Sequence, residues 1–321
     1  MRTSIALTAL CLASAWIVQP ACAEEYPSRE IKLICGFPAG SGADVTYRFV
    51  AEKLRPLVGK PVIVENRPGL QGYLAAAEVA KSKPDGHTVM LAGGSGLAAV
   101  RFVLKHSPVD PLNDFDYIGT LLKQGWYMSV GANSPARSVS ELTSYLKTKG
   151  SKASYATSTN MGTVFAELYK AAAGVQPLQI NYKGINDAMN DLSSGEVDMA
   201  MTDPPFTIGG IHSGRIRALA VSTAKRSAAT PDIPAMAELG FGDIDFAVWW
   251  SIQVAAATPK PVRDQLARWF EAVLQMDETK KFFASIGSEV FISSPESTRA
   301  LIIEDMEHWR EYARRAKIEP M

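Results

Sequence analysis

Apolar and polar positions alternate along the chain with two different periods. Short runs rich in β-branched residues are separated by segments in which apolar residues recur every three or four positions, as in amphipathic helices. In the first third, this pattern predicts strands at 31–37, 61–65 and 87–91 and helices at 45–57 and 75–81. Strands that alternate with helices are typical of βαβ units in a mostly parallel sheet. The pattern therefore predicts an α/β protein.

The alternation breaks between residues 110 and 138. Two extended segments, 115–121 and 126–130, follow each other there without room for a crossover helix. We interpret this break as the passage of the chain from one lobe into another, and a long extended segment at 244–256 as its return. This organisation predicts a ligand cleft between two lobes. Lobe 1 is expected to comprise residues 24–124 and 247–321, and lobe 2 residues 125–246.

The rest of the chain continues the pattern. In lobe 2 we expect helices at 140–147, 163–173 and 186–193 and extended segments at 153–156, 197–201 and 216–223. The carboxyl-terminal part is predicted to be helical from Pro259 onward, at 278–286 and at 295–316.

The amino-terminal residues 1–23 have the features of a secretory signal peptide. Arg2 precedes an apolar stretch at 5–18, and Ala21-Cys22-Ala23 provides the small residues of a cleavage site. The stretch is shorter than the roughly 20 residues of a membrane span, and residues 18–21 are a poor approach to a lipidated Cys22. Export would leave Cys35 as the only cysteine, so we expect a periplasmic protein without an internal disulfide.

The charge balance limits the kinds of partner. Lys plus Arg and Asp plus Glu number 33 each in 321 residues, so no overall field attracts nucleic acid or an anionic membrane. Three cysteines and four histidines are few for thiol or metal chemistry. We therefore expect no nucleic-acid partner, no metal and no cofactor, and a charged ligand would have to be held by a local site.

A glycine-containing loop joins the first predicted strand to the first predicted helix, with the sequence Phe37-Pro38-Ala39-Gly40-Ser41-Gly42-Ala43-Asp44. Backbone N–H groups and the positive end of the helix dipole point at whatever lies there, so the loop is a candidate anion site. It could instead be a dinucleotide loop, with Gly40-x-Gly42 and a ribose-binding Glu65, although Val45 occupies the third glycine position. The remaining alternative is a tight turn in which Asp44 favours the helix start.

A second loop of this kind occurs in lobe 2. There, a short strand is followed by Thr157-Ser158-Thr159-Asn160-Met161-Gly162-Thr163 and then by a helix. Its hydroxyls and backbone N–H groups would lie at another positive helix end. Taken alone, the loop could be no more than a helix cap formed by Thr159 or Asn160. As a pair, one loop per lobe could close on one carboxylate from both sides.

The first loop and a series of further short stretches carry a family resemblance over essentially the whole mature chain. The other stretches are Tyr26-Pro27, Val64-Glu65-Asn66-Arg67-Pro68-Gly69, Pro84-Asp85-Gly86-His87-Thr88, Tyr182-Lys183-Gly184, 195–203, Gly214-Arg215-Ile216-Arg217-Ala218-Leu219-Ala220, Pro231-Asp232-Ile233-Pro234 and Trp250. With these stretches the sequence resembles the Bug-type, TctC-like periplasmic solute-binding proteins of tripartite tricarboxylate transporters.

The resemblance implies a two-lobed fold of the type II periplasmic binding protein class, in which each lobe is a mixed sheet flanked by helices. It implies that hinge closure grips a carboxylate through backbone donors and bound water, and that large and small inner-membrane transporter subunits receive the ligand. We expect a monomer. Candidate ligand-binding residues are Phe37, Ala39, Gly40, Ser41, Gly42, Ala43 and Asp44 from lobe 1, Gly94, Ser95 and Gly96 on the cleft floor, Thr157, Ser158, Thr159, Asn160, Met161 and Gly162 from lobe 2, and Asp203 and Trp250.

Three features bear on the choice of ligand. The second loop is usually rich in Gly and Ser in this family, whereas Thr159, Asn160 and Met161 narrow the space here. Asp203 is either an acceptor for a ligand amine or a turn residue before two prolines. The hinge region is aromatic, and its rings are either core residues or a stacking surface for an aromatic carboxylate. These aromatic residues are Trp126, Tyr127, Trp249 and Trp250.

Enzymatic functions find little support in the sequence. Ser41 lacks both glycines of a Gly-x-Ser-x-Gly elbow, and Ser95 lacks the second. We expect no enzymatic activity. The main hypothesis is a periplasmic binding protein for a small carboxylate, with an aromatic dicarboxylate among the candidates. The alternatives are a dinucleotide-dependent periplasmic oxidoreductase and a receptor that senses the ligand without transporting it.

Overall fold

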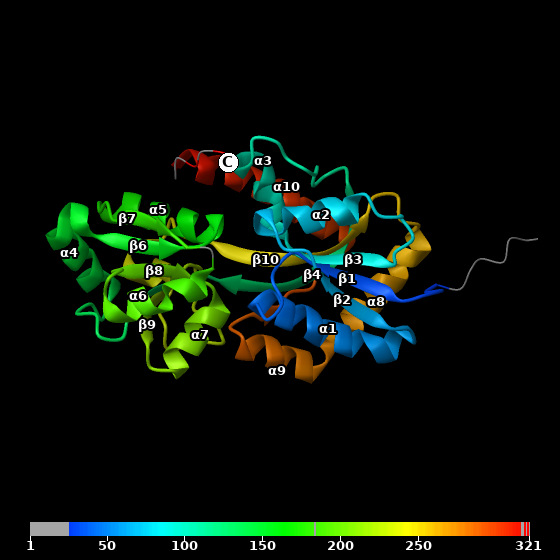
Figure 1. The fold of residues 1–321 in the computed structure, drawn as a ribbon, viewed down its shortest axis with the longest axis horizontal. Helices are drawn as coiled ribbons and strands as arrows, with labels where there is room; N and C mark the ends of the chain where they lie inside the picture. Colours follow the sequence, from blue (N-terminus) through cyan, green and yellow to red (C-terminus); the bar gives the residue numbers. More distant parts are fainter. Residues whose placement is uncertain (1–25, 183, 316–317, 319, 321) are drawn as a thin grey trace, which may run out of the picture.

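The computed structural model describes residues 26–182, 184–315, 318 and 320. These residues form two lobes, each a sheet flanked by helices, which lie next to each other along the long axis of the molecule (Figure 1). The predicted signal peptide at 1–23 lies outside the described residues. The two-lobed α/β architecture predicted from the sequence is confirmed.

The first lobe is built on a six-stranded sheet with the order β11-β4-β10-β3-β1-β2. Strand β1 is parallel to β2 and β3, whereas β10 is antiparallel to β3 and β4. The strands are β1 (Ile31–Cys35), β2 (Val62–Asn66), β3 (Thr88–Gly93), β4 (Phe115–Gly125), β10 (Ala247–Ala255) and β11 (Glu289–Val290). The helices are α1 (Gly42–Val58), α2 (Tyr73–Ala80), α3 (Gly94–Val103), α8 (Lys260–Gln275), α9 (Asp277–Ser285) and α10 (Pro295–Arg315).

The second lobe is built on a five-stranded sheet with the order β7-β6-β8-β5-β9. Here β6 is parallel to β7 and β8, and β5 is antiparallel to β8 and β9. The strands are β5 (Tyr127–Gly131), β6 (Ser154–Thr157), β7 (Leu178–Asn181), β8 (Met199–Thr202) and β9 (Ile216–Val221). The helices are α4 (Val139–Lys149), α5 (Asn160–Ala173), α6 (Met189–Ser194) and α7 (Pro204–His212). Short 3-10 turns lie at Leu70–Gly72, Gly150–Lys152, Ile185–Ala188 and Met236–Leu239.

Two helices were not predicted from the sequence. Helix α3 begins directly at Gly94, so the run Gly93-Gly94-Ser95-Gly96 is a helix start. Helix α7 begins with Pro204 and Pro205, which the sequence indicated as a turn. Proline is well tolerated in a first helical turn because its missing N–H would have no partner there. In both α3 and α7, burial of the apolar residues that follow stabilises the helix.

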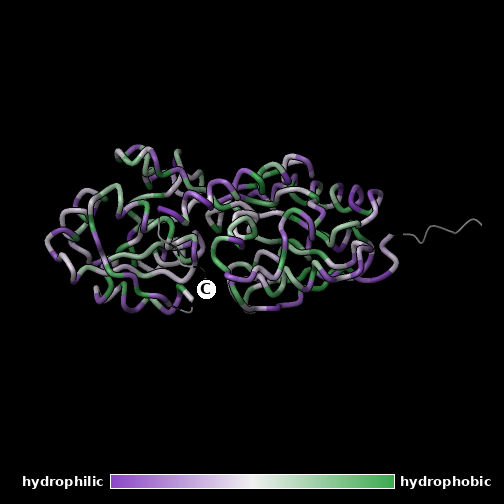
Figure 2. Tube along the Cα trace, turned by 90° about the horizontal axis from the view of Figure 1, so that it is seen from above, coloured by the Kyte–Doolittle hydropathy of each residue, from purple (hydrophilic) through white to green (hydrophobic). Residues whose placement is uncertain are grey.

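The core continues from one lobe into the other. One cluster of buried apolar side chains includes residues of α3 and α10 and residues of α5 and the second sheet. A separate cluster fills the opposite face of the first sheet beneath α1 and α8. Figure 2 shows apolar stretches in the interior of both lobes and polar stretches at the outer turns. Helix α10 contacts α3, β4 and α5, so it spans both lobes, and its Trp309 is buried.

Two strands cross between the lobes, and Ser222 joins them. The N–H of Trp126, between β4 and β5, donates to Oγ of Ser222 at 2.9 Å, and the N–H of Ser222 donates to the carbonyl of Trp126 at 2.8 Å. Ser222 Oγ also donates to the carbonyl of Phe246, just before β10, at 2.5 Å. Ser222 is fully buried.

Among the helices of the described ranges, none combines the length and apolar character that crossing a membrane requires.

Candidate functional site

The loop between β1 and α1 presents free backbone donors. Ser41 caps α1, since its Oγ accepts the N–H of Asp44 at 3.3 Å, while the N–H of Ser41 itself donates to the carbonyl of Pro38. Gly42 and Ala43 follow as the first two helical residues, and their N–H groups have no partner within the helix. Gly40 has φ +79°, a left-handed conformation that glycine adopts without strain. The loop therefore directs two N–H groups and the positive helix end outward.

Asp44 has a different role from the one expected. Its carboxylate is buried and accepts hydrogen bonds from the N–H of Gly40, Nε of Arg48 and Nδ2 of Asn66, each at 2.9 Å. Burial acts to raise the pKa of Asp44, but the hydrogen bonds from Arg48, Gly40 and Asn66 outweigh it and hold the pKa below its ordinary value. Because its N–H is used by the Ser41 cap and its carboxylate by these partners, Asp44 fixes the loop and offers no donor to a ligand.

The flanking residues support this geometry. Phe37 is half-buried against the core of the first lobe, and its carbonyl accepts Nδ2 of Asn66 at 3.0 Å. Ala39 is exposed. Asn66 had no assigned role in the sequence, although its place at the end of β2, next to β1 in a parallel sheet, brings it to the loop. Only the order of the strands in the folded sheet, in which β2 lies next to β1, indicates this role for Asn66.

The second loop has the same construction. Thr159 caps α5 by accepting the N–H of Gly162 at 3.2 Å, and Asn160 and Met161 are the first two helical residues. The helix thus starts three residues earlier than predicted. Nδ2 of Asn160 is buried without a hydrogen-bond partner among the described residues. Half-buried Ser158 and almost fully buried Met161 complete the loop.

Gly162 and Thr157 hold this loop close to the sheet. A Cβ on Gly162 would lie only 2.4 Å from Oγ1 of Thr157 and 3.1 Å from the carbonyl oxygen of Met201, at the end of β8. Thr157 is buried, and its Oγ1 donates to the carbonyl of Thr159 at 3.1 Å. The absence of a side chain at Gly162 is therefore required by the close approach of α5 to β8.

A third helix begins beside the other two. Asp203 caps α7, with its Oδ1 accepting the N–H of Phe206 at 3.0 Å, and burial raises the pKa of its carboxyl. The next two residues are prolines, which have no N–H. Unlike the starts of α1 and α5, the start of α7 therefore offers an acceptor. The sequence left open whether Asp203 is a turn residue, and the structure makes it a helix cap.

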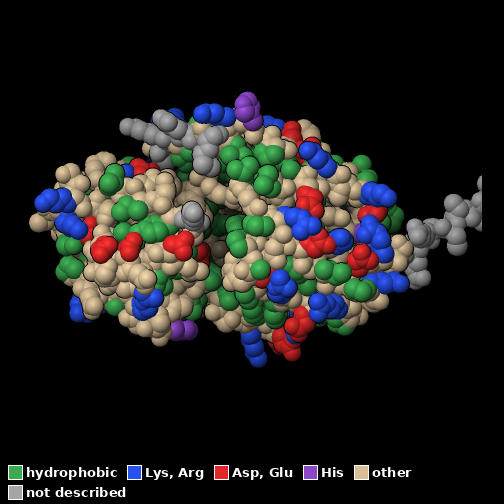
Figure 3. Space-filling view, in the orientation of Figure 1, with side chains coloured by type: hydrophobic (Ala, Val, Ile, Leu, Met, Phe, Trp, Pro, Cys, Tyr) green, Lys and Arg blue, Asp and Glu red, His purple; other side chains and the backbone are tan. Residues whose placement is uncertain are grey.

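The starts of α1 and α7 meet between the lobes, and α5 begins at the same sheet edge as α7 because β6 and β8 are parallel neighbours. The space-filling view shows a hollow between the lobes near the centre of the molecule (Figure 3). In each sheet, parallel strands end at the same edge, and the loops follow β1 in the first lobe and β6 and β8 in the second. A Cβ on Gly42 would lie 3.2 Å from Cγ of Pro205, so the starts of α1 and α7 are in contact across the lobes. The tertiary structure thus brings together two groups of donors and one acceptor.

The residues predicted for the cleft floor have close neighbours within the first lobe, and their place in the site stays a prediction. Gly94 lies against the ring of Trp249, because a Cβ there would be 2.1 Å from the nearest ring carbon. Ser95 is buried beside the carboxyl of Asp305 on α10 and thus faces that helix, and Gly96 accepts the hydroxyl of Tyr73 at 2.8 Å. Gly94 and Ser95 therefore pack within the first lobe.

The two neighbouring tryptophans have different surroundings. Trp249 is buried, and its indole N–H donates to Asp305 at 2.7 Å. Trp250 is half-buried and lies against the ring of Tyr47 on α1, with ring centroids 6.3 Å apart. It pairs with Gly93, where β3 ends at the cleft edge of the first sheet. Trp250 is therefore less buried than Trp249 and lies where β3 ends.

The family assignment follows from comparison with known proteins. A family model described as the tripartite tricarboxylate transporter family receptor, TctC, matches residues 46–317. The chain belongs to this family. The resemblance noted in the sequence is thereby confirmed, and with it the assignment to the periplasmic solute-binding proteins.

Relatives of this TctC receptor agree with that assignment over almost the whole chain. Protein BugT of Bordetella pertussis is 29% identical over 312 residues, which cover 96% of each chain. The structure of the periplasmic binding protein BugD is similar with a TM-score of 0.83 and 30% identity, and covers 92% of this chain and 100% of BugD. The structure of R. palustris Rpa4515 with adipate has a TM-score of 0.86 and 28% identity, with the same two coverages.

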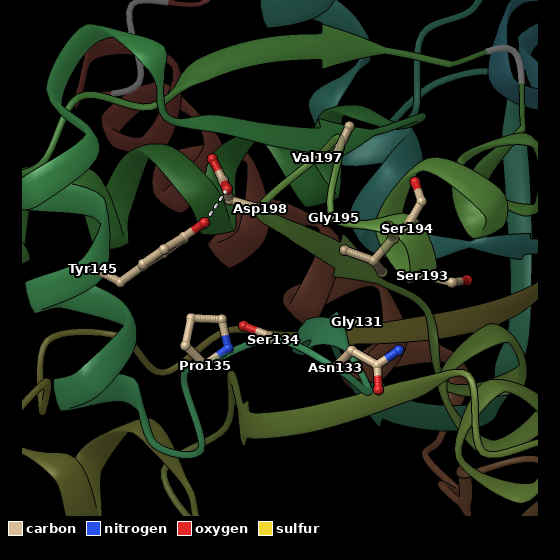
Figure 4. Close-up of a pocket in the computed structure, with 11 residues that line it drawn as sticks. Gly131, Asn133, Ser134, Pro135, Tyr145, Ser193, Ser194, Gly195, Val197 and Asp198 are labelled. Carbon is tan, nitrogen blue, oxygen red and sulfur yellow. Dashed lines mark hydrogen bonds between the residues drawn. The ribbon is translucent and has the colours of Figure 1, made fainter.

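The TctC receptor also has a cavity of about 90 Å³ within the second lobe. Figure 4 shows Tyr145, Asp198, Ser134 and Ser193 around it. Asp198 is buried, but its carboxylate already accepts the Tyr145 hydroxyl at 3.2 Å, Nζ of Lys149 at 2.5 Å and the N–H of Ser154 at 2.9 Å. The buried carboxylate of this cavity is therefore already paired within the protein. Within residues 26–182 and 184–315, no group of three or more metal-ligating side chains is found.

Proposed function

We propose that this TctC receptor captures a small carboxylate between its lobes and delivers it to a tripartite transporter. The observation that carries the proposal is the pair of helix starts with free N–H groups, Gly42 and Ala43 on α1 and Asn160 and Met161 on α5, which come from different lobes. Backbone N–H groups at helix starts are well suited to an anion. The adipate in the similar Rpa4515 structure supports a carboxylate ligand.

Donors from both lobes would make closure dependent on the ligand. A ligand shifts the balance between open and closed forms only by its different affinity for the two. A carboxylate that bridges α1 and α5 can contact both helix starts at once only when the lobes are closed. The neutral overall charge of the chain is compatible with this, because the attraction comes from backbone dipoles at the site.

The ligand class follows from the rest of the site. Trp250 beside Tyr47 offers a ring for stacking, which supports an aromatic dicarboxylate as the class to test first. Asp203 and the two prolines after it favour a second class, a carboxylate that also carries an ammonium or hydroxyl group, since this part of the site only accepts hydrogen bonds. The buried Nδ2 of Asn160 adds a donor for another oxygen of the ligand.

A thermal-shift screen followed by calorimetry tests the proposal. The panel contains adipate, malate, citrate, aspartate and the benzene dicarboxylates, with uncharged amides of the same acids as controls. A ligand at 100 times its dissociation constant should add about 2.7 kcal/mol to the free energy of unfolding. Binding of an acid but not of its amide supports the proposal, and no binding of any carboxylate contradicts it.

We also propose the cellular setting. Removal of residues 1–23 would release a periplasmic monomer whose lobes divide at 124/125 and 246/247 and whose partners are the large and small inner-membrane subunits. No enzymatic activity and no cofactor are proposed, because the glycine loop binds Asp44 internally and ends in a helix start suited to a small anion. Saturable binding of NAD or flavin would favour the oxidoreductase instead. If cells that lack the membrane subunits still take up the ligand, delivery to the transporter is contradicted. The remaining alternative is then a receptor that senses the ligand without transporting it.

A further inference from the structure

The first turn of α7 contacts the first lobe at two glycines. A Cβ placed on Gly42 would lie 3.2 Å from Cγ of Pro205. A Cβ on Gly287, in the turn between α9 and β11, would lie 2.6 Å from Cβ of Pro204 and 2.9 Å from Cδ1 of Ile208. Figure 1 shows α7 on the inner side of the second lobe, next to α1 and α9. We call these five residues the interlobe contact.

The interlobe contact is apolar and depends on the absence of two side chains. Pro204 and Gly287 are buried, and Pro205 and Ile208 are half-buried. Gly42 has an ordinary helical conformation, so backbone strain does not require glycine there, and its missing side chain instead leaves room for Pro205. Gly287 is required for two reasons: its φ of +74° favours glycine, and its missing side chain leaves room for Pro204.

The position of this contact links it to ligand binding. Gly42 carries one of the free N–H groups of α1, and Pro204 directly follows Asp203, the acceptor of the site. When Pro205 rests on Gly42, the donors of the first lobe and the acceptor of the second lobe are therefore held at a fixed separation. Because α1 and α7 belong to different lobes, the contact is lost when the lobes move apart.

We propose that Pro204, Pro205 and Ile208 are positioning residues for ligand binding, which fix the closed separation of the lobes by packing against Gly42 and Gly287. The effect on ligand affinity rests on the proposed function, whereas the contact itself does not. The contact uses the space left by the missing side chains of Gly42 and Gly287 and not the N–H groups proposed to face the ligand. Its loss should therefore shift the balance toward the open form and weaken binding, even though no ligand-contacting side chain has changed.

A disulfide across the contact tests its existence without any ligand. In the double variant Gly42→Cys/Pro205→Cys, the two Cβ atoms would be 3.4 Å apart, next to the range of about 3.5–4.5 Å found in disulfides. Burial raises the pKa of Cys35, the only other cysteine of the mature chain, to about 11, so it should stay reduced. The two single-cysteine variants are the controls.

Mild oxidation of the ligand-free double variant should convert most of it to an intramolecular disulfide. Mass spectrometry counts the free thiols, and small-angle X-ray scattering follows the radius of gyration, which should not exceed that of the wild type and should respond to reduction. The proposal would be overturned if the double variant folds but its two new thiols stay reduced and titratable, both with and without adipate as the probe.

Substitution of Gly287 tests the consequence for binding. Gly287→Ala forces a Cβ against Pro204 and Ile208, and Gly59→Ala is the matched control because Gly59 has a similar φ of +68° with open space around it. Gly209→Ala controls for a change on α7 itself, since nothing lies within 4 Å of its added Cβ. Comparison with Gly59→Ala separates the steric effect from backbone strain.

Ligand-free Gly287→Ala should show a larger radius of gyration than Gly59→Ala or Gly209→Ala. With adipate as the probe, its dissociation constant should rise about tenfold more than that of Gly59→Ala at a similar melting temperature. Equal scattering and equal affinity for Gly287→Ala and Gly59→Ala would contradict the proposal. If the wild type binds no carboxylate, the proposed function fails. The disulfide and scattering experiments still show whether the interlobe contact exists, because they need no ligand.

Discussion

The indole N–H of Trp249 donates a hydrogen bond of 2.7 Å to Oδ2 of Asp305, which ties the strand that returns from the second lobe to the helix that spans both lobes. Trp249 is buried and Asp305 is half-buried, with Ser95 at the start of α3 beside the same carboxyl and His308 one turn further along α10. The start of α3, β10 and α10 therefore meet at one polar group inside an apolar core.

Asp305→Ala should lower the free energy of unfolding by about 1–3 kcal/mol, because the buried indole N–H of Trp249 loses its acceptor. Asp305→Asn keeps an acceptor and should cost less. Urea denaturation at constant pH measures both. Glu304→Gln, at the exposed neighbouring position, is the control and should have little effect.

The pH dependence of Asp305 should be opposite to that of a usual carboxyl. Burial raises its pKa, so in the range just above the ordinary value of 3.8 the folded protein binds more protons than the unfolded chain. The contribution of Asp305 to stability should therefore decrease as the pH rises through this range. Relative to Asp305→Asn, the wild type should be more stable at the acidic end, and a difference that grows with pH would contradict the assignment.

Asp44→Asn should weaken ligand binding and destabilise the folded protein, since the buried carboxylate holds Gly40, Arg48 and Asn66 around the first loop. The pKa of Asp44 is lowered, so its contribution is present above the ordinary value of 3.8 and is lost as the pH falls through the lower folded value. We expect a loss of about 1–3 kcal/mol at neutral pH that shrinks in acid. Asp264→Asn, which removes an exposed pair with Lys260, is the control.

Ser222→Ala should loosen the hinge. The substitution leaves the buried N–H of Trp126 without its acceptor and removes the bond to the carbonyl of Phe246, at an expected cost of about 1–3 kcal/mol. Because both crossing strands are affected, ligand dissociation should also become faster in stopped-flow measurements. Ser144→Ala, on the exposed face of α4, should change neither quantity.

Trp250→Phe should remove most of the fluorescence change that an aromatic ligand causes. Trp250 is the half-buried tryptophan at the cleft edge, whereas Trp269 stacks on Tyr26 at a centroid distance of 5.7 Å, away from the helix starts. Trp269→Phe should therefore keep the change. Titration with a benzene dicarboxylate measures it, and an unchanged signal in Trp250→Phe would argue against stacking at this residue.

Much of the fold could be predicted from the sequence because most strands and most helices have a local signal, whereas the short strands β7 and β11 were not predicted. The segments 31–37 and 62–66 are apolar and β-branched, and Ser41 and Thr159 are typical helix caps. Helices α3 and α7 were missed for the opposite reason. Their first residues are glycine and proline, which indicate a loop when read alone, and burial against the rest of the fold outweighs that preference.

The sequence by itself determined the two-lobed class, the two loops and the capping residues, because these depend on neighbours a few positions apart. Only the tertiary structure decided how the candidates are used. Asp44 turned inward because strand order brings Asn66 next to it, and Ser95 faced Asp305, 210 positions later in the chain. The contact of Gly42 with Pro205 joins residues of different lobes, so no local pattern could indicate it.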